Sequence, residues 1–152
     1  MTFLQRFLRA LGERWRAGRS SRIGTSLGSD TILSNFLTTR RAIRRNGVHS
    51  SAFMPRHGEL STFQTQGLHE ADIWQIAVRY VLQPSRRVHG RAENPPEDYL
   101  EFGLRLTADN QPPRHVNAAN WPTDKDDVKE IALVLASKAR LVRCVPPKAK
   151  TA

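Results

Sequence analysis

The chain has 152 residues, 39% of them hydrophobic, which is enough for one domain that buries its own core without disulfides or a structural metal. The single Cys144 excludes an intramolecular disulfide and favours a reducing compartment, so we expect a cytoplasmic protein. No apolar run reaches the roughly 20 residues of a membrane-spanning helix, and we expect neither a membrane span nor a secretory signal.

The formal net charge of +10 is concentrated in the amino-terminal third of the chain. Residues 1–50 hold ten Arg and no Lys against Glu13 and Asp30, a net charge of +8, and residues 51–152 carry the remaining +2. A nearly neutral body with a basic end indicates contact with a polyanion or with an anionic membrane surface.

Residues 3–16 have the spacing of an amphipathic helix with arginines on its polar face, including Arg6, Arg9 and Arg16. Its apolar face is formed by Phe3, Leu4, Phe7, Leu8, Leu11 and Trp15. A Ser/Gly-rich stretch follows and predicts a flexible linker. We therefore divide the chain into a basic amphipathic helix with its linker (1–28), a globular domain (29–145) and a polar tail (146–152).

The first elements of the predicted domain are a helix and a hairpin. Ser29 or Asp30 can cap a helix that ends near Thr38, with a buried face of Ile32, Leu33, Phe36 and Leu37. Asn46-Gly47 then predicts a hairpin turn, because both residues accept positive φ, and continuation of a helix is the alternative.

Helices and short strands alternate along the rest of the domain. Strands are predicted over 60–66, 86–92, 104–107 and 141–145. A helix is predicted from Glu70 to Leu82, with Ile73, Ile76, Ala77, Tyr80 and Val81 turned inward. A short helix follows Pro95, and a longer one capped by Thr123 buries Val128, Ile131, Ala132, Leu135 and Ala139. This pattern predicts a small single α+β domain with a few short strands and three to four helices.

The motifs of several enzyme and metal-binding classes are missing from the sequence. The five histidines form no H-x-x-x-H pair, a cysteine cluster is impossible, and no D-x-D-x-D loop occurs, so we expect no metal site. The glycine-rich motifs of P-loop nucleotidases and dinucleotide enzymes are absent as well, and we expect no cofactor. Cys144 lies in a predicted apolar strand, where it reads as a small buried hydrophobe rather than a nucleophile.

Residues 112–122, PPRHVNAANWP, gather hydrogen-bonding side chains between prolines. In a functional interpretation His115 acts as an acid, a base or a phosphate ligand, and Asn117 holds an oxyanion or a ring. Arg114 then binds an anion and Trp121 stacks on a ligand. In a structural interpretation His115 and Asn117 simply alternate along a short strand, while Trp121 forms an apolar lid. The structural interpretation is favoured because His115 has no motif partner.

A second polar stretch, RRVHGRA, places His89 next to Arg91. These two residues can line an anion pocket, where Gly90 would let a ligand approach the backbone. They can equally belong to an edge strand whose charges discourage pairing with other chains, and this second interpretation is favoured.

Three functions are compatible with these observations. The first is non-specific nucleic-acid binding through the arginines before position 50, among which Arg40, Arg41, Arg44 and Arg45 form the densest cluster. The second is an adaptor whose amphipathic helix docks on a protein partner, on a second copy or on a membrane surface, or serves as a transit peptide. The third is a small enzyme that processes phosphate esters or nucleotides with His115.

Overall fold

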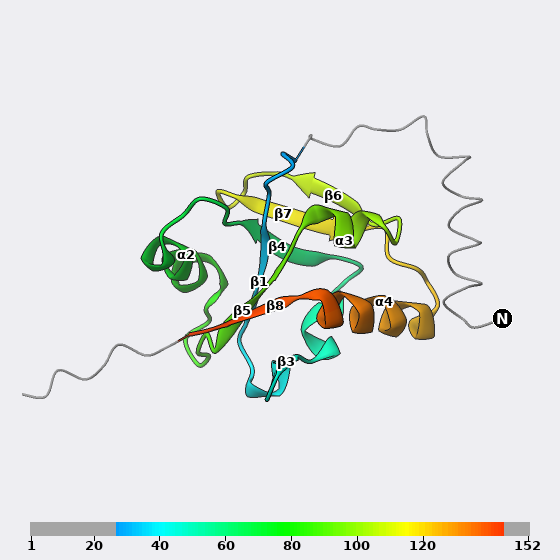
Figure 1. Ribbon diagram of the computed structural model, residues 1–152, viewed down its shortest axis with the longest axis horizontal. Helices are drawn as coiled ribbons and strands as arrows, with labels where there is room; N and C mark the ends of the chain where they lie inside the picture. The colour runs from blue at the N-terminus through cyan, green and yellow to red at the C-terminus, as the bar shows by residue number, and fades with distance from the viewer. Residues whose placement is uncertain (1–26, 145–152) are drawn as a thin grey trace, which may run out of the picture.

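The computed structural model describes residues 27–144, and within them the chain is built around one six-stranded antiparallel sheet (Figure 1). Across the sheet the strands follow the order β6-β7-β4-β1-β5-β8. In chain order the strands are β1 (Leu33–Leu37), β4 (Leu60–Gln64), β5 (Gly90–Asn94), β6 (Arg105–Ala108), β7 (His115–Ala119) and β8 (Arg140–Arg143).

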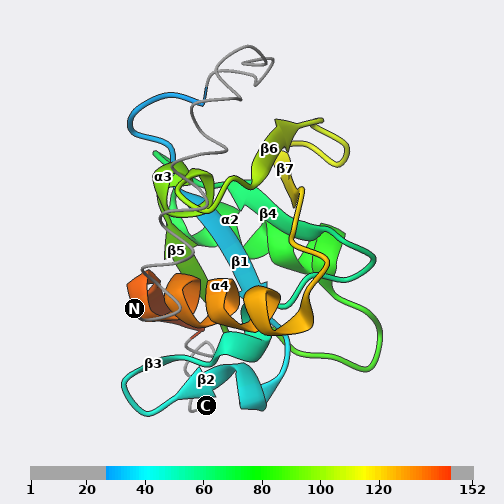
Figure 2. The same cartoon turned by 90° about the vertical axis from the view of Figure 1, so that its right-hand side faces the viewer.

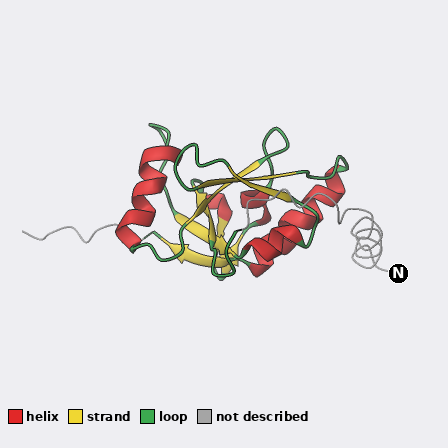
Figure 3. Cartoon of the chain, turned by 90° about the horizontal axis from the view of Figure 1, so that it is seen from above, coloured by secondary structure: helices red, strands yellow, loops and turns green. Residues whose placement is uncertain are grey.

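Helices cover both faces of this sheet, as Figure 3 shows from above. One face packs against three helical segments: η2 (Ser50–Phe53), α3 (Pro96–Leu100) and α4 (Lys125–Lys138). The other face packs against α2 (Glu70–Ile76) and a following π-helical turn, η3 (Ala77–Val81). The predicted combination of helices and short strands in one small domain is confirmed, with three α-helices in the described part.

β1 occupies the middle of the sheet, where the apolar spacing predicts a helix. That prediction is wrong, because residues 33–37 pair with β4 on one side and with β5 on the other. All five residues are buried: Leu33 and Leu37 join the core beneath α4, and Phe36 joins the core beneath α2. A strand covered on both faces loses the alternation of apolar and polar residues that identifies a half-exposed strand.

The larger core lies between the sheet and α4, which crosses the sheet in Figure 2. Phe53 and Tyr99 are fully buried there, with ring centroids 6.5 Å apart. Ile131 and Leu135 of α4 pack into the same core. Asn94 Nδ2 donates a hydrogen bond of 3.1 Å to the carbonyl oxygen of Leu135, so a buried amide also joins β5 to the helix.

The amino terminus of α4 is capped one residue later than the sequence predicts. Asp124, not Thr123, is the capping residue, and its Oδ1 accepts the N–H groups of Asp126 (2.8 Å) and Asp127 (3.2 Å). These bonds satisfy two of the free N–H groups at the start of the helix.

A small hairpin projects from the end of β1. β2 (Ile43–Arg44) and β3 (Gly47–Val48) form the hairpin that Asn46-Gly47 predicts, and the 3-10 helix η1 (Arg40–Ala42) leads into it. The turn lies one residue earlier than predicted, at Arg45-Asn46, because Gly47 pairs with Arg44, and neither Asn46 nor Gly47 adopts a positive φ. Arg143 of β8 attaches this hairpin to the sheet, since its Nη2 donates to the carbonyl oxygens of Arg44 (3.1 Å) and Arg45 (3.2 Å). The hairpin is therefore held at its turn as well as by its own pairing.

Most other predicted elements are present with shifted ends. The strand predicted over 60–66 is β4, and the short helix after Pro95 is α3. The strand predicted over 86–92 begins only at Gly90.

The predicted helix from Glu70 to Leu82 changes its winding after Ile76. There the chain forms a π turn, in which the N–H of Leu82 donates to the carbonyl oxygen of Ala77 over 2.9 Å. This wider turn shifts the helical register by about one residue. Val81 packs in the smaller core, as predicted, whereas Tyr80, which was also predicted to point inward, is 39% exposed.

Arg91 of β5 fixes α2 over the sheet. Its side chain is 3% exposed, and two of its nitrogens donate to the two carboxylate oxygens of Glu70 over 2.6 and 2.9 Å. Its guanidinium carbon lies 4.7 Å from the ring centroid of Trp74, one turn further along α2. The pKa of Glu70 is lowered, first by the hydrogen bonds from Arg91, against a smaller opposite effect of burial. A charge pair and a cation–π contact thus hold the same helix.

The predicted amphipathic helix over 3–16, its linker and the tail 146–152 involve residues outside the described range. Among residues 27–144, no helix is long and apolar enough to cross a membrane.

Replacing Glu70 with Gln should lower the free energy of unfolding by about 2 kcal/mol, because the buried Arg91 loses its main counter-charge. The loss should stay below the roughly 3–5 kcal/mol of a fully buried pair, since the Glu70 side chain is 63% exposed. Urea unfolding followed by circular dichroism measures this difference. Glu59→Gln is the matched control, as Glu59 is exposed and forms no ion pair with the described residues. Equal unfolding midpoints for the two variants would contradict the assigned role of Glu70.

Candidate functional site

His115 begins β7, and its side chain is held between a carboxylate and an aromatic ring. Nδ1 of His115 lies 2.7 Å from Oδ1 of Asp109, in the loop that precedes the strand. The imidazole packs edge-on against Phe63 of β4, with 5.4 Å between ring centroids. Only 9% of the residue is exposed. The structure therefore orients this imidazole firmly, as either a structural or a catalytic role would require.

The carboxyl group of Asp109 has a pKa below its ordinary value of 3.8. Partial burial acts to raise this pKa, but hydrogen bonds from the backbone N–H of Gln111 and from His115 outweigh that effect. Asp109 is consequently ionised in the folded protein at neutral pH, and it offers a negative charge to the imidazole.

Asn117 lies two residues along β7 and shares the sheet face of His115. Its Oδ1 is buried and accepts no hydrogen bond from the described residues. Asn117 pairs with Ser61 of β4 and with Thr107 of β6, and both of these partners are exposed. The structure thus brings together His115 and Asn117, on a polar part of the sheet.

Trp121 does not join these two residues. Its indole Nε1 donates to the carbonyl oxygen of Ala118 over 3.0 Å, and the ring packs against the larger core, on the opposite face of the sheet from His115. The structure therefore gives Trp121 the position of an apolar lid, as in the structural interpretation of the sequence.

His89 and His115 lie in different parts of the sheet. The strand pairings place His115 level with Ser34 of β1, whereas His89 lies beyond Leu37, at the other end of that strand. Three strand spacings, roughly 14 Å, also separate β5 from β7. The two histidines thus share no pocket in this arrangement. The hypothesis of an enzyme that uses His115 therefore gains no support from His89.

Arg91 also faces away from solvent, since its guanidinium is occupied by Glu70 and Trp74. Arg91 and His89 therefore do not line one anion pocket. The favoured interpretation of this stretch as an edge strand is wrong as well, because β5 pairs with β1 on one side and with β8 on the other. Cys144 follows β8, is half-buried, and donates its N–H to the carbonyl oxygen of His89. Among residues 27–144, no group of three or more His, Cys, Asp or Glu side chains is placed to hold a metal ion.

Several exposed arginines follow β1, and Arg143 at the end of β8 is hydrogen-bonded to the backbone of two of them, Arg44 and Arg45. We call this set the arginine rim and define it as Arg40, Arg41, Arg44, Arg45 and Arg143. All five side chains are exposed. Within residues 27–144 the arginines that form ion pairs are Arg91 and Arg140, so none of the rim is neutralised by a carboxylate there. The other predicted arginines, Arg6, Arg9 and Arg16, lie outside the described residues.

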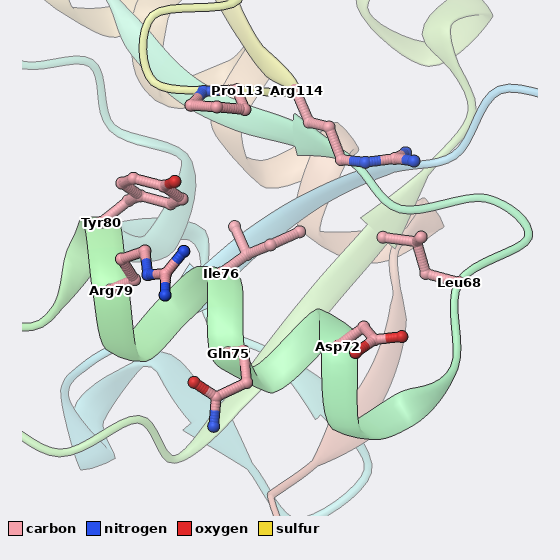
Figure 4. Close-up of a pocket in the computed structure, with 8 residues that line it drawn as sticks. All are labelled: Leu68, Asp72, Gln75, Ile76, Arg79, Tyr80, Pro113 and Arg114. Atoms are coloured by element: carbon pink, nitrogen blue, oxygen red, sulfur yellow. The ribbon is translucent and has the colours of Figure 1, made fainter.

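An open groove of about 300 Å³ lies between α2 with its π turn and the loop before β7 (Figure 4). Arg114 extends along one side of it, and its Nη1 donates to the carbonyl oxygen of Gln64 over 3.3 Å. The lining residues are Leu68, Asp72, Gln75, Ile76, Arg79, Tyr80, Pro113 and Arg114. Of these, only Arg114 was a candidate from the sequence. The helical spacing predicts that Tyr80 faces the core. No local sequence pattern predicts that residues 68–80 lie beside residues 113–114.

No family model, no curated protein and no solved structure matches this chain.

Replacing Asp109 with Asn should destabilise the protein by about 1 kcal/mol at neutral pH, because the imidazole loses a charged hydrogen-bond partner at a partly exposed site. A carboxyl group with a lowered folded-state pKa stabilises the fold above its unfolded-state pKa, and this contribution is lost as the pH falls through the folded-state value. The difference between wild type and Asp109→Asn should therefore persist down to about pH 4 and shrink below it. Urea midpoints from pH 7 to pH 2.5 measure the trend. A difference that does not change with pH would show that the carboxylate charge has no part in it.

Proposed function

We propose that the protein binds nucleic acid with little sequence preference, through phosphate contacts made by the arginine rim. The guanidinium group presents several N–H donors in a planar fork that matches phosphate oxygens. Phosphate contacts position a protein on nucleic acid without reading bases, because every nucleotide carries the same backbone. The observation that carries the proposal is the set of five exposed arginines that no described carboxylate neutralises.

The geometry of the hairpin supports this function. The Nη2 atom of Arg143 donates to two carbonyl oxygens at the hairpin turn, which leaves the N–H groups of Nη1 and Nε for a further acceptor. The same bonds tie Arg44 and Arg45 to the edge of the sheet. A hairpin whose backbone is already held in place loses less conformational entropy when it meets a phosphate backbone.

The distribution of acidic residues also supports binding by the rim. Half of the 14 acidic residues of the chain lie on or beside α3 and the first part of α4: Glu97, Asp98, Glu101, Asp124, Asp126, Asp127 and Glu130. These seven carboxylates therefore lie on other elements than the rim, and on α4 they outnumber the lysines of its first part, Lys125 and Lys129. Such a separation steers a polyanion toward the rim and away from α3 and α4.

Replacing Arg44 and Arg45 with Ala in the full chain should weaken binding to a labelled duplex DNA and make that binding less dependent on salt. If each side chain contacts one phosphate, the slope of log K against log salt should become shallower by about 1.8. Between 50 and 200 mM salt, the variant should therefore lose roughly tenfold less affinity than the wild type. Fluorescence anisotropy titrations at several salt concentrations measure both quantities.

The matched control is the double substitution Lys125→Ala and Lys129→Ala, which removes the same charge from exposed positions of α4. This control should leave the salt slope close to that of the wild type. Equal changes in both double variants would mean that net charge alone drives association, and no measurable duplex binding at 50 mM salt would refute the proposal.

A further inference from the structure

The groove beside α2 has arginines on both of its sides. Arg79 is exposed on the π turn, and Arg114 is exposed on the loop that crosses above the helix (Figure 4). Neither forms an ion pair within residues 27–144. Arg114 is partly anchored by its bond to the Gln64 carbonyl oxygen. Its backbone is left-handed, with φ of 69°, a conformation that is unfavourable for a residue other than glycine.

An aromatic side chain stands beside the arginine on the π turn. Tyr80 would lie inward if α2 continued with ordinary winding, but the π turn places it on the groove, 39% exposed and next to Arg79. Ile76 and Leu68 contribute apolar side chains to the lining of the groove.

We propose that this groove binds a short stretch of single-stranded nucleic acid, with one base stacked on Tyr80 and neighbouring phosphates at Arg79 and Arg114. Positive charge along an open groove, together with an exposed aromatic ring, is how proteins hold single strands without reading their sequence. The inference deepens the proposed nucleic-acid function, but it depends on residues that are separate from the arginine rim.

Asp72 gives the site a base preference that can be tested. It is the one carboxylate among the lining residues, and it repels phosphate while accepting hydrogen bonds from amino groups. A nucleic-acid strand in the groove therefore places the edge of a base, rather than a phosphate, next to Asp72. Adenine and cytosine present amino groups there, whereas thymine does not. Oligo(dA) should consequently bind more tightly than oligo(dT), and Asp72→Asn should reduce this difference by strengthening the binding of oligo(dT).

Tyr80→Leu tests the stacking contact directly in the full chain. It should weaken the binding of a labelled single-stranded octanucleotide, (dA)8, by about tenfold, because a stacked base loses its aromatic platform. Binding of a 20-base-pair duplex should stay within about twofold of the wild type, since paired bases cannot stack on the side chain. Tyr80→Phe keeps the ring and should restore the binding of (dA)8.

Arg79→Gln tests the phosphate contact, with Arg87→Gln as the matched control. Arg87 is exposed on the loop before β5 and does not line the groove. Arg79→Gln should make the salt slope for (dA)8 shallower by about 0.7, whereas the control should leave it unchanged. Circular dichroism melting curves of all variants verify that the fold is retained.

The outcomes separate this inference from the proposed function. If (dA)8 binding depends on Tyr80 but the duplex does not bind, the groove is supported and the rim is refuted. If (dA)8 binds Tyr80→Leu as tightly as the wild type, the groove inference is refuted, whatever the duplex does. If an acidic octapeptide displaces (dA)8 and binds more tightly with the same dependence on Tyr80, the groove is a peptide site and the inference is also overturned.

Discussion

A guanidinium buried in the face of a sheet must keep its hydrogen bonds and its counter-charge, and this requirement on Arg91 determines where α2 lies. The carboxylate of Glu70 meets the guanidinium edge, while Trp74 covers its face. Both partners belong to α2 and are spaced by one helical turn, so the helix has little freedom to rotate or slide over the sheet. The aromatic contacts of Phe36 with Trp74 and with Phe63 continue the same packing across β1 and β4. The groove depends on this arrangement, because the π turn that carries Tyr80 directly follows α2.

The two proposed nucleic-acid surfaces occupy different parts of the same sheet. The arginine rim lies at the β2–β3 hairpin, which Arg143 attaches to the edge strand β8. The groove lies over the opposite half of the sheet, between α2 and the loop before β7. The larger core beneath α4 supports the rim, because it includes Ala42 and Val48, whereas the smaller core beneath α2 supports the groove through Ile76. A rim that contacts phosphates and a groove that takes unpaired bases would together favour nucleic acid with a single-stranded segment beside a duplex.

Local patterns predicted the elements whose structure is decided locally. Asn46-Gly47 predicted the hairpin to within one residue of its turn, and the spacing of Ile131, Ala132 and Leu135 predicted α4, because turn conformation and helix period act over a few residues. The spacing in β1 wrongly predicts a helix, because the two neighbouring strands and both covering layers come from distant parts of the chain. The exposure of Tyr80 depends on a π turn, and no residue spacing in the sequence predicts that turn. For the candidate sites, the clustered arginines of the rim were visible in the sequence. The partner of Arg91 stands 21 residues away, and the groove joins segments more than 30 residues apart, so neither followed from periodicity or spacing.

The claim that Arg91 holds α2 on the sheet is tested most directly by hydrogen exchange of the Arg91→Lys variant. Lysine keeps the positive charge but lacks the planar fork that bonds both oxygens of Glu70 and stacks on Trp74. Amide hydrogens of residues 70–81 should then exchange at least about tenfold faster than in the wild type, because the helix opens locally, whereas those of β4 and β7 should keep their protection. Unchanged exchange across 70–81, or an equal acceleration throughout the sheet, would contradict this account.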